Sequence, residues 1–173
     1  VVLPTTGRLH IEERIHALEP DARRLAEDLS VLTGTFTVEA VRTLATIAPA
    51  KILSALTELK RRGLITAVNE RFRFATRSTR EILYAALAEE SRRELHAKAA
   101  AFLAAGKAPP TELFPHLLIA GKNIEALRCG LEAATALRTA CDMEKSLDVL
   151  TRISQLPEWA AQGPEAEFLL AEV

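Results

Sequence analysis

Residues 34–84, GTFTVEAVRTLATIAPAKILSALTELKRRGLITAVNERFRFATRSTREILY, carry the pattern that decides the fold of this chain. Two short stretches with apolar residues at helical spacing come first, over 38–46 and about 49–62. Thr37 suits the N-cap of the first stretch, and Gly63, which follows three basic residues, suits the end of the second. Two runs of alternating apolar and polar residues follow, and they predict hairpin strands at 64–68 and 71–75.

A further helix after the hairpin completes the order of a winged helix-turn-helix module, in which the hairpin is the wing. Two loops fit the hairpin: a two-residue turn at Asn69-Glu70, or a longer loop, because Glu70 takes a positive φ less readily than Asn69. Ser78 or Thr79 is the expected N-cap of the helix that follows.

Apolar spacing before and after this module predicts additional helices. A short leading helix ends at Pro20, which opens the next one, and an apolar stripe runs from Ala22 to Leu32 before Gly34. Another helix is expected over 91–105. Gly106 and the pair Pro109-Pro110 then interrupt the chain. We therefore predict two domains, a winged-helix module with flanking helices over 1–106 and helical hairpins over 107–173.

In the second domain, helices are expected at about 111–120, 123–139, 143–155 and 165–173. Short corners between helices make them antiparallel neighbours. Residues 127–158 partly fit a tetratricopeptide (TPR) pattern, with Ser146 in place of the expected alanine. The predicted fold class is mostly α: a winged helix-turn-helix with one β-hairpin, followed by antiparallel helical hairpins that begin a TPR-like solenoid.

Composition and motifs argue against catalysis by this chain. It lacks the glycine-rich phosphate loop, the dinucleotide-binding fingerprint and the common hydrolase signatures, so we expect no catalytic residues and no cofactor. The four histidines and two cysteines show no metal-ligand spacing, so no metal is expected. The chain has no apolar run long enough for a membrane span and no recognisable signal peptide, and its two cysteines are expected to be free thiols. We therefore expect a cytoplasmic location and no membrane partner.

Charge is distributed unevenly along the chain. Residues 34–80 carry nine basic and three acidic residues, a net charge of +6, whereas the whole chain carries −1. Such a basic module suits either phosphate groups or an acidic protein surface. The second predicted helix of the module offers Lys51, Ser54, Ala55, Thr57 and Glu58 on its outer face, which is a poor set for reading base edges. We therefore expect weak, sequence-independent DNA binding at most. The face available to DNA or to a protein consists of Lys51, Lys60, Arg61, Arg62, Arg71 and Arg73.

Several segments together carry a resemblance to a known family. LEPDARRLAEDLSVLTGTF (18–36), ALTELKRRGLI (55–65), RFRF (71–74), TREILY (79–84) and ESRRELHAKAAAFL (90–103) resemble the winged-helix segment that follows the nucleotide-binding core of STAND-type signal-transduction ATPases. AGKNIEALRCGLEAATALRTACDMEKSLDVL (120–150) resembles the opening of their superhelical sensor region. The family includes LuxR-type and maltose-activator-like regulators. The resemblance covers nearly the whole chain and implies a fragment of a longer protein.

One position departs from the family pattern. Relatives commonly carry a histidine after the second wing strand, which the winged helix can use to sense bound nucleotide. Here that position is Thr76, which can form hydrogen bonds but cannot titrate near neutral pH. The resemblance therefore implies only a weakened nucleotide-sensing role for Thr76, and the matching residues Arg80, Glu81 and Tyr84 suit packing of the wing against the helix.

These observations predict a non-catalytic regulatory fragment that couples an adjoining ATPase core to helical hairpins able to bind a protein partner. The alternative is a winged-helix DNA-binding transcriptional regulator with a helical oligomerisation domain. A free-standing helical adaptor is a third reading, which leaves the basic module without a role.

Overall fold

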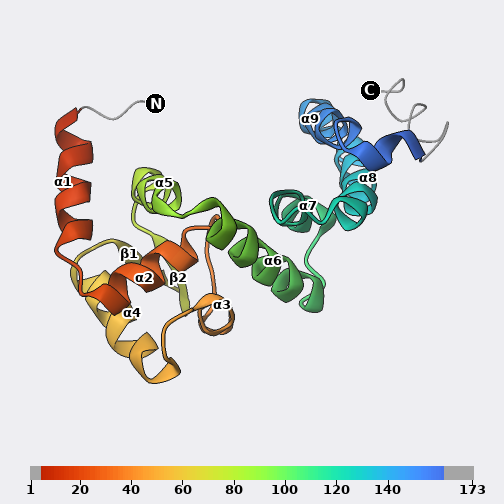
Figure 1. Ribbon diagram of the computed structural model, residues 1–173. Coiled ribbons are helices and arrows are strands. Elements are labelled where there is room, and N and C mark those ends of the chain that lie inside the picture. The colour runs from red at the N-terminus through yellow and green to blue at the C-terminus, as the bar shows by residue number, and fades with distance from the viewer. Residues whose placement is uncertain (1–4, 162–173) are drawn as a thin grey trace. The chain divides into compact units, whose positions relative to one another are not determined.

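The computed structural model describes residues 5–161, and the side chains of residues 8–159. The described part is mostly helical and contains one two-stranded antiparallel sheet, which confirms the predicted mostly α class (Figure 1). The helix expected over 165–173 lies outside the described residues. The chain divides into two compact units between Ala99 and Ala100. The predicted boundary after residue 106 follows the end of a helix instead, and it stays a prediction.

The first unit begins with four helices whose starts follow local rules. Pro20 occupies the first turn of its helix, where the missing N–H has no intrahelical partner to lose. Thr37 caps the next helix, because its hydroxyl accepts a hydrogen bond from the backbone N–H of Ala40 at 3.3 Å. A short 3₁₀ turn, Pro49–Lys51, leads directly into the last of the four. The helices are α1 (Thr5–His16), α2 (Pro20–Leu29), α3 (Val38–Leu44) and α4 (Ile52–Arg61).

Helix α2 ends earlier than the apolar stripe suggested. Its C-cap is Ser30, whose hydroxyl donates to the Glu27 carbonyl at 2.6 Å. Leu32 is buried beyond the helix, within a turn that reaches Gly34 at φ +77°. A stripe of buried residues thus continued past the helix because the following turn also packs into the core.

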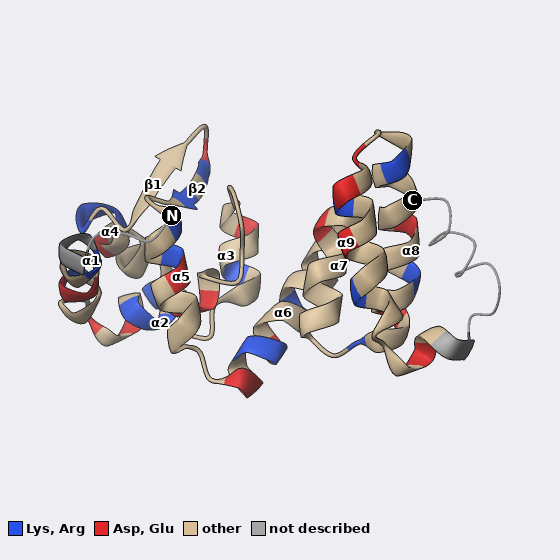
Figure 2. Cartoon of the chain, turned by 90° about the horizontal axis from the view of Figure 1, so that it is seen from above, with Lys and Arg blue, Asp and Glu red and all other residues tan. Residues whose placement is uncertain are grey.

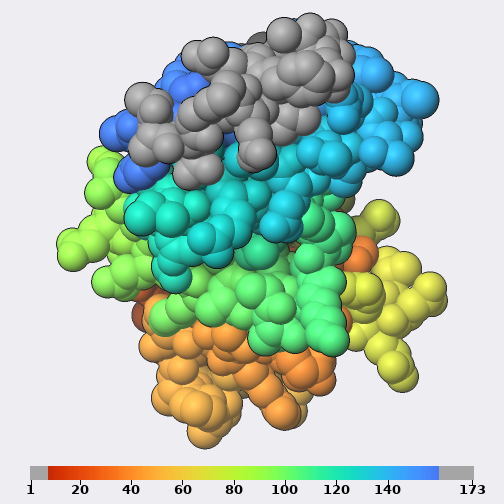
Figure 3. Space-filling model, turned by 90° about the vertical axis from the view of Figure 1, so that its right-hand side faces the viewer, coloured from red at the N-terminus to blue at the C-terminus, as the bar shows by residue number. Residues whose placement is uncertain are grey.

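The hairpin consists of β1 (Ile65–Val68) and β2 (Arg71–Phe74), which pair antiparallel with Ile65 opposite Phe74. Asn69 and Glu70 form the two-residue turn, with φ of +48° and +63°, so the shorter of the two expected loops is the one present. A β-bridge joins Phe36 to Phe72, and their ring centroids lie 6.2 Å apart. The hairpin (yellow) projects from the first unit in the space-filling view (Figure 3).

Helices α5 (Arg77–Ala86) and α6 (Glu89–Ala105) follow the hairpin. The N-cap of α5 is Thr76, whose hydroxyl accepts from the backbone N–H of Thr79 at 3.1 Å. The expectation that Ser78 or Thr79 caps this helix is therefore wrong. Thr79 is buried at 1% exposure inside the first turn. The segment 76–79 contains three hydroxyl residues, and the sequence does not indicate which of them is the cap.

The core of the first unit lies mainly between α2 and α4. Its fully buried side chains come from both helices and from the chain around them: Leu25, Leu29, Leu44, Leu59, Leu64, Ile65 and Leu83. One buried acid supports this core. Asp28 accepts hydrogen bonds from the backbone N–H and the hydroxyl of Thr46, both at 2.7 Å, and so fixes the end of α3 against α2.

The second unit contains α7 (Pro110–Ile119), α8 (Asn123–Thr139), α9 (Met143–Ser154) and a 3₁₀ turn, Pro157–Ala161. The corners at Gly121 and Cys141 both use positive φ, +72° and +60°, which allows very short connections. The expected start and end of each of these helices agree with the structure to within a residue or two. Ser146 is buried and donates its hydroxyl hydrogen bond to the Ala134 carbonyl at 3.0 Å, so serine is accommodated where the TPR pattern favours alanine.

Candidate functional site

The first unit has a basic hollow beside the N-terminus of α5. Its volume is about 410 Å³, and it is lined by Thr33, Gly34, Arg73, Phe74, Thr76, Arg77 and Arg80. Three of these residues are arginines and none is acidic, so the lining carries a charge of +3. The N-terminus of a helix adds partial positive charge from its unpaired N–H groups. We call this feature the arginine hollow.

The three arginines are held differently. Arg80 donates from Nη1 to the Ser30 carbonyl at 3.1 Å and lies 5.8 Å from the centroid of the Tyr84 ring, so its guanidinium is positioned by the core. Arg77 pairs with Glu81 at 2.6 Å along the exposed side of α5. This hydrogen bond holds the pKa of the Glu81 carboxyl below its usual value. Arg73 lies on β2, and among the described residues its guanidinium reaches only the Thr66 hydroxyl, at 3.4 Å.

Thr76 lies in the hollow, but its hydroxyl is already engaged. It accepts from the backbone N–H of Thr79 and lies 2.8 Å from the Thr79 hydroxyl. The position that the family resemblance associates with nucleotide sensing therefore serves as a helix cap. A ligand in the hollow would meet the arginines as its charged contacts.

The other predicted basic residues are not all equally available. Arg62 donates from Nη2 to the Ala17 carbonyl at 2.8 Å and lies 3.8 Å from a Glu58 carboxylate oxygen, while Arg14 donates from Nε to the Arg62 carbonyl at 2.8 Å. Each arginine thus covers the C-terminal end of the other's helix. The Nζ atom of Lys51 lies 3.7 Å from Oδ2 of Asp21, and both side chains of this ion pair are exposed.

Lys60, Arg61 and Arg71 are exposed, and none of them forms an ion pair within the described residues. Basic segments are visible on β2 and at α4 in the charge-coloured view (Figure 2). The structure therefore divides the predicted set: Arg73 lies at the hollow, Arg62 is committed to the joint between α1 and α4, and the rest lie on open surface.

The outer face of α4 differs from the expected one. Ala55 is buried at 3% exposure, so its predicted outward placement is wrong, and Leu53 is exposed at 76%. The hydroxyls of Ser54 and Thr57 donate to carbonyls of their own helix, at 2.9 and 2.8 Å. Neither hydroxyl needs an external partner, which leaves this face poor in groups that read base edges.

The sequence indicates Arg77 only as a charge, and Arg80 as a charge and as a residue that packs the wing against its helix. It does not indicate that Thr33 and Gly34 belong to a site. The two arginines are three residues apart at the start of a helix with no acid in its first turn, and that pattern could have indicated a basic helix terminus. Thr33 and Gly34 lie about forty residues away in sequence, and no local signal connects them to α5.

Within the described residues, no three histidine, cysteine, aspartate or glutamate side chains gather in a way that could hold a metal ion. None of the helices described is long and apolar enough to cross a membrane.

Comparison with known proteins identifies a shared architecture. No protein-family model matches the chain, and no curated sequence is similar to it. Among solved structures, the chain is similar to the Signal Transduction ATPase with Numerous Domains (STAND) protein with a tetratricopeptide repeat sensor from Pyrococcus horikoshii, with a TM-score of 0.67 and 20% identity. The similarity covers 99% of this chain and 28% of that one. The chain therefore has the fold of a segment of a STAND protein and spans just over a quarter of that neighbour's length.

Proposed function

We propose that this chain is a non-catalytic regulatory segment of a signal-transduction ATPase. In this proposal α2, α3, α4 and the hairpin form a winged helix-turn-helix module that couples to a nucleotide-binding core. The second unit is the start of a TPR-like sensor that binds a protein partner. The fold shared with a STAND protein supports the general assignment, and the arrangement of a basic hollow next to a projecting hairpin supports the coupling role.

The arginine hollow is the observation that carries the proposal. Its lining is wholly neutral or basic, and Arg80 is pre-positioned by the Ser30 carbonyl. A preorganised cluster of guanidinium groups suits phosphate or carboxylate oxygens, which it can contact in a bidentate manner. We infer that the hollow receives an anionic group presented by the core, either from its bound nucleotide or from its own acidic surface.

The test uses a longer product of the same gene that includes the region before residue 1. If that region contains a phosphate loop, its ATP hydrolysis and its ADP release are measured with Arg77→Gln, Arg80→Gln and, as a matched surface control, Arg152→Gln. Arg152 pairs with Asp148 on α9, outside the hollow. We expect ADP release to accelerate by about three- to tenfold for the hollow variants, from the loss of one charge-assisted contact. Equal rates in all three variants would reject the coupling role of the hollow.

DNA binding is the second candidate, and the exposed arginines of β2 and basic end of α4 favour it. Selection from a random duplex pool decides between the two. We expect no motif and an affinity that falls at least tenfold between about 50 and 200 mM salt, as several phosphate contacts require. A reproducible motif that Lys51→Ala or Ser54→Ala abolishes would instead identify a transcription regulator.

A further inference from the structure

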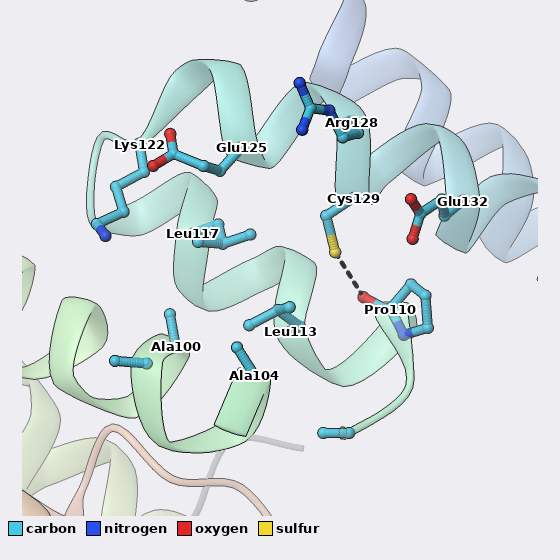
Figure 4. A pocket seen from close by; sticks show the side chains of 12 residues that line it. Ala100, Ala104, Pro110, Leu113, Leu117, Lys122, Glu125, Arg128, Cys129 and Glu132 are labelled. Carbon is cyan, nitrogen blue, oxygen red and sulfur yellow. Dashed lines mark hydrogen bonds between the residues drawn. The ribbon is translucent and has the colours of Figure 1, made fainter. Parts of the chain in front are cut away.

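The second unit has a groove of its own, between the last two turns of α6 and the outer side of α8. Its volume is about 360 Å³, at the lower end of the range for small-ligand sites. Ala100 and Ala104 form one wall, and Leu113 and Leu117 of α7 form the floor between the walls (Figure 4). Alanine side chains leave this wall shallow, so apolar surface remains open to a ligand.

The opposite wall is charged. Four residues of alternating sign line it: Lys122, which precedes α8 as its N-cap, and Glu125, Arg128 and Glu132 on α8. All four side chains are exposed, and none forms an ion pair with another residue in the part of the chain that the structure describes. The neighbouring helix behaves differently, because α9 pairs Lys145 with Asp142 and Arg152 with Asp148.

The two outermost charges have opposite signs and lie at opposite ends of the groove. Figure 4 shows Lys122 at one end, Glu132 at the other, and both leucines between them. Glu132 follows the N-cap Lys122 by ten residues, which corresponds to about 15 Å at about 1.5 Å per residue of helix. The Glu132 end is closed by Cys129, whose thiol donates to the Pro110 carbonyl at 3.5 Å.

We propose that this groove binds a short apolar peptide with free termini, its carboxylate at Lys122 and its ammonium group at Glu132. An extended peptide of three or four residues spans roughly 10–14 Å, and the flexible side chains of Lys122 and Glu132 cover the remaining distance. The apolar side chains of the peptide contact Ala104, Leu113 and Leu117. Its central N–H and C=O groups face Glu125 and Arg128, which accept and donate hydrogen bonds respectively.

A volume this small favours a peptide of this length over a protein helix, because a stable protein interface buries far more surface than a 360 Å³ groove offers. Free termini matter because one end of the groove carries a positive charge, which attracts a carboxylate, and the other carries a negative charge, which attracts an ammonium group. This proposal does not depend on the coupling role of the first unit.

Calorimetric titration of the 173-residue chain with the tetrapeptide Ala-Leu-Leu-Ala tests it. We expect a dissociation constant of roughly 0.1–1 mM, given the size and flexibility of the ligand. Acetylating the amino end or amidating the carboxyl end should each weaken binding by about three- to tenfold, because each removes one charged contact.

Variants assign the two ends. Glu132→Gln should remove the effect of acetylation and keep that of amidation, and Lys122→Gln should do the reverse. Glu144→Gln, an exposed glutamate on α9 outside the groove lining, is the charge-matched control and should behave like the native chain. Ala104→Leu should abolish binding of every form. Ala104 is exposed, so this change should leave the melting temperature unaltered.

Four outcomes would overturn the proposal, three of them in the peptide titrations. They are no binding at about 5 mM peptide, equal binding of free and blocked peptides, and undiminished binding by Ala104→Leu. A concentration-dependent dimer that Ala104→Leu abolishes would overturn it too, because a second copy of the chain would then occupy the groove.

Discussion

Gly130 in α8 lies where three helices of the second unit meet, and adding one methyl group there should destabilise that unit. A Cβ at this position would lie 2.5 Å from Cγ2 of Ile153 and 3.0 Å from Cε2 of Phe114. Both neighbours are almost completely buried, at 0% and 2% exposure, so neither side chain can move into solvent. Overpacking of this kind costs about 1–3 kcal/mol, while the higher helix propensity of alanine returns up to about 1 kcal/mol.

We therefore expect Gly130→Ala to lower the free energy of unfolding by about 1–2 kcal/mol. Urea unfolding followed by circular dichroism measures it, and for a unit of this size each kcal/mol corresponds to about 4–8 °C in melting temperature. Gly106→Ala is the matched control, because a Cβ there would meet nothing closer than 3.5 Å, and we expect it to change stability by less than about 0.5 kcal/mol.

A double variant separates steric conflict from other causes. Ile153→Ala alone should cost about 2–5 kcal/mol. Combined with Gly130→Ala, the total should fall short of the sum by about 1 kcal/mol or more, because the clashing group is gone. The reasoning fails if Gly130→Ala is as stable as the native chain, or if the two changes are additive.

Three further predictions follow from single groups. Burial, aided by the charge of Glu132, raises the pKa of the Cys129 thiol to about 11. At pH 8, iodoacetamide should therefore modify the exposed Cys141 at least about a hundredfold faster than the buried Cys129. Mass spectrometry measures the two rates, and the difference should disappear in urea. Burial raises the pKa of Asp28 despite its hydrogen bonds to Thr46. The stability contributed by its protonated form should thus be complete below the unfolded pKa of about 3.9 and should decline as pH rises through the folded pKa. Urea titrations over this pH range should show the native chain losing stability relative to Asp28→Asn. The chain alone should hydrolyse no ATP. Thr76→His should lower the free energy of unfolding by about 1 kcal/mol through loss of the cap, and it should not create micromolar affinity for nucleotide. Detection of such affinity by calorimetry would contradict this prediction.

Much of the fold could be predicted because its boundaries depend on local chemistry. Pro20 and Gly63 begin or end helices through their backbone preferences, and Thr37 begins one through its side-chain hydroxyl. The alternation on either side of Asn69 sets the hairpin. The cap of α5 could not be chosen, because burial of Thr79 decided between neighbouring hydroxyls. Ala55 needed no tertiary information, because it lies three residues after Ile52 and four before Leu59, and this helical spacing already places it on the buried face.

The candidate site was less predictable than the fold. The basic character of the module followed from composition, but the arginine hollow depends on Gly34 lying beside α5, which only the folded chain shows. Arg62 illustrates the opposite error, since a basic residue at a helix end looked available and is instead bonded to the Ala17 carbonyl.

The hydrogen bonds from Arg14 to the Arg62 carbonyl and from Arg62 to the Ala17 carbonyl also have a mechanical consequence. Each guanidinium donates to a carbonyl at the C-terminal end of the other's helix. Helices α1 and α4 are therefore held together at one point by directional hydrogen bonds as well as by apolar packing. Strand β1 begins three residues after Arg62. A displacement of the C-terminal end of α1 would therefore be transmitted by these hydrogen bonds to Arg62, and from there to the start of the hairpin.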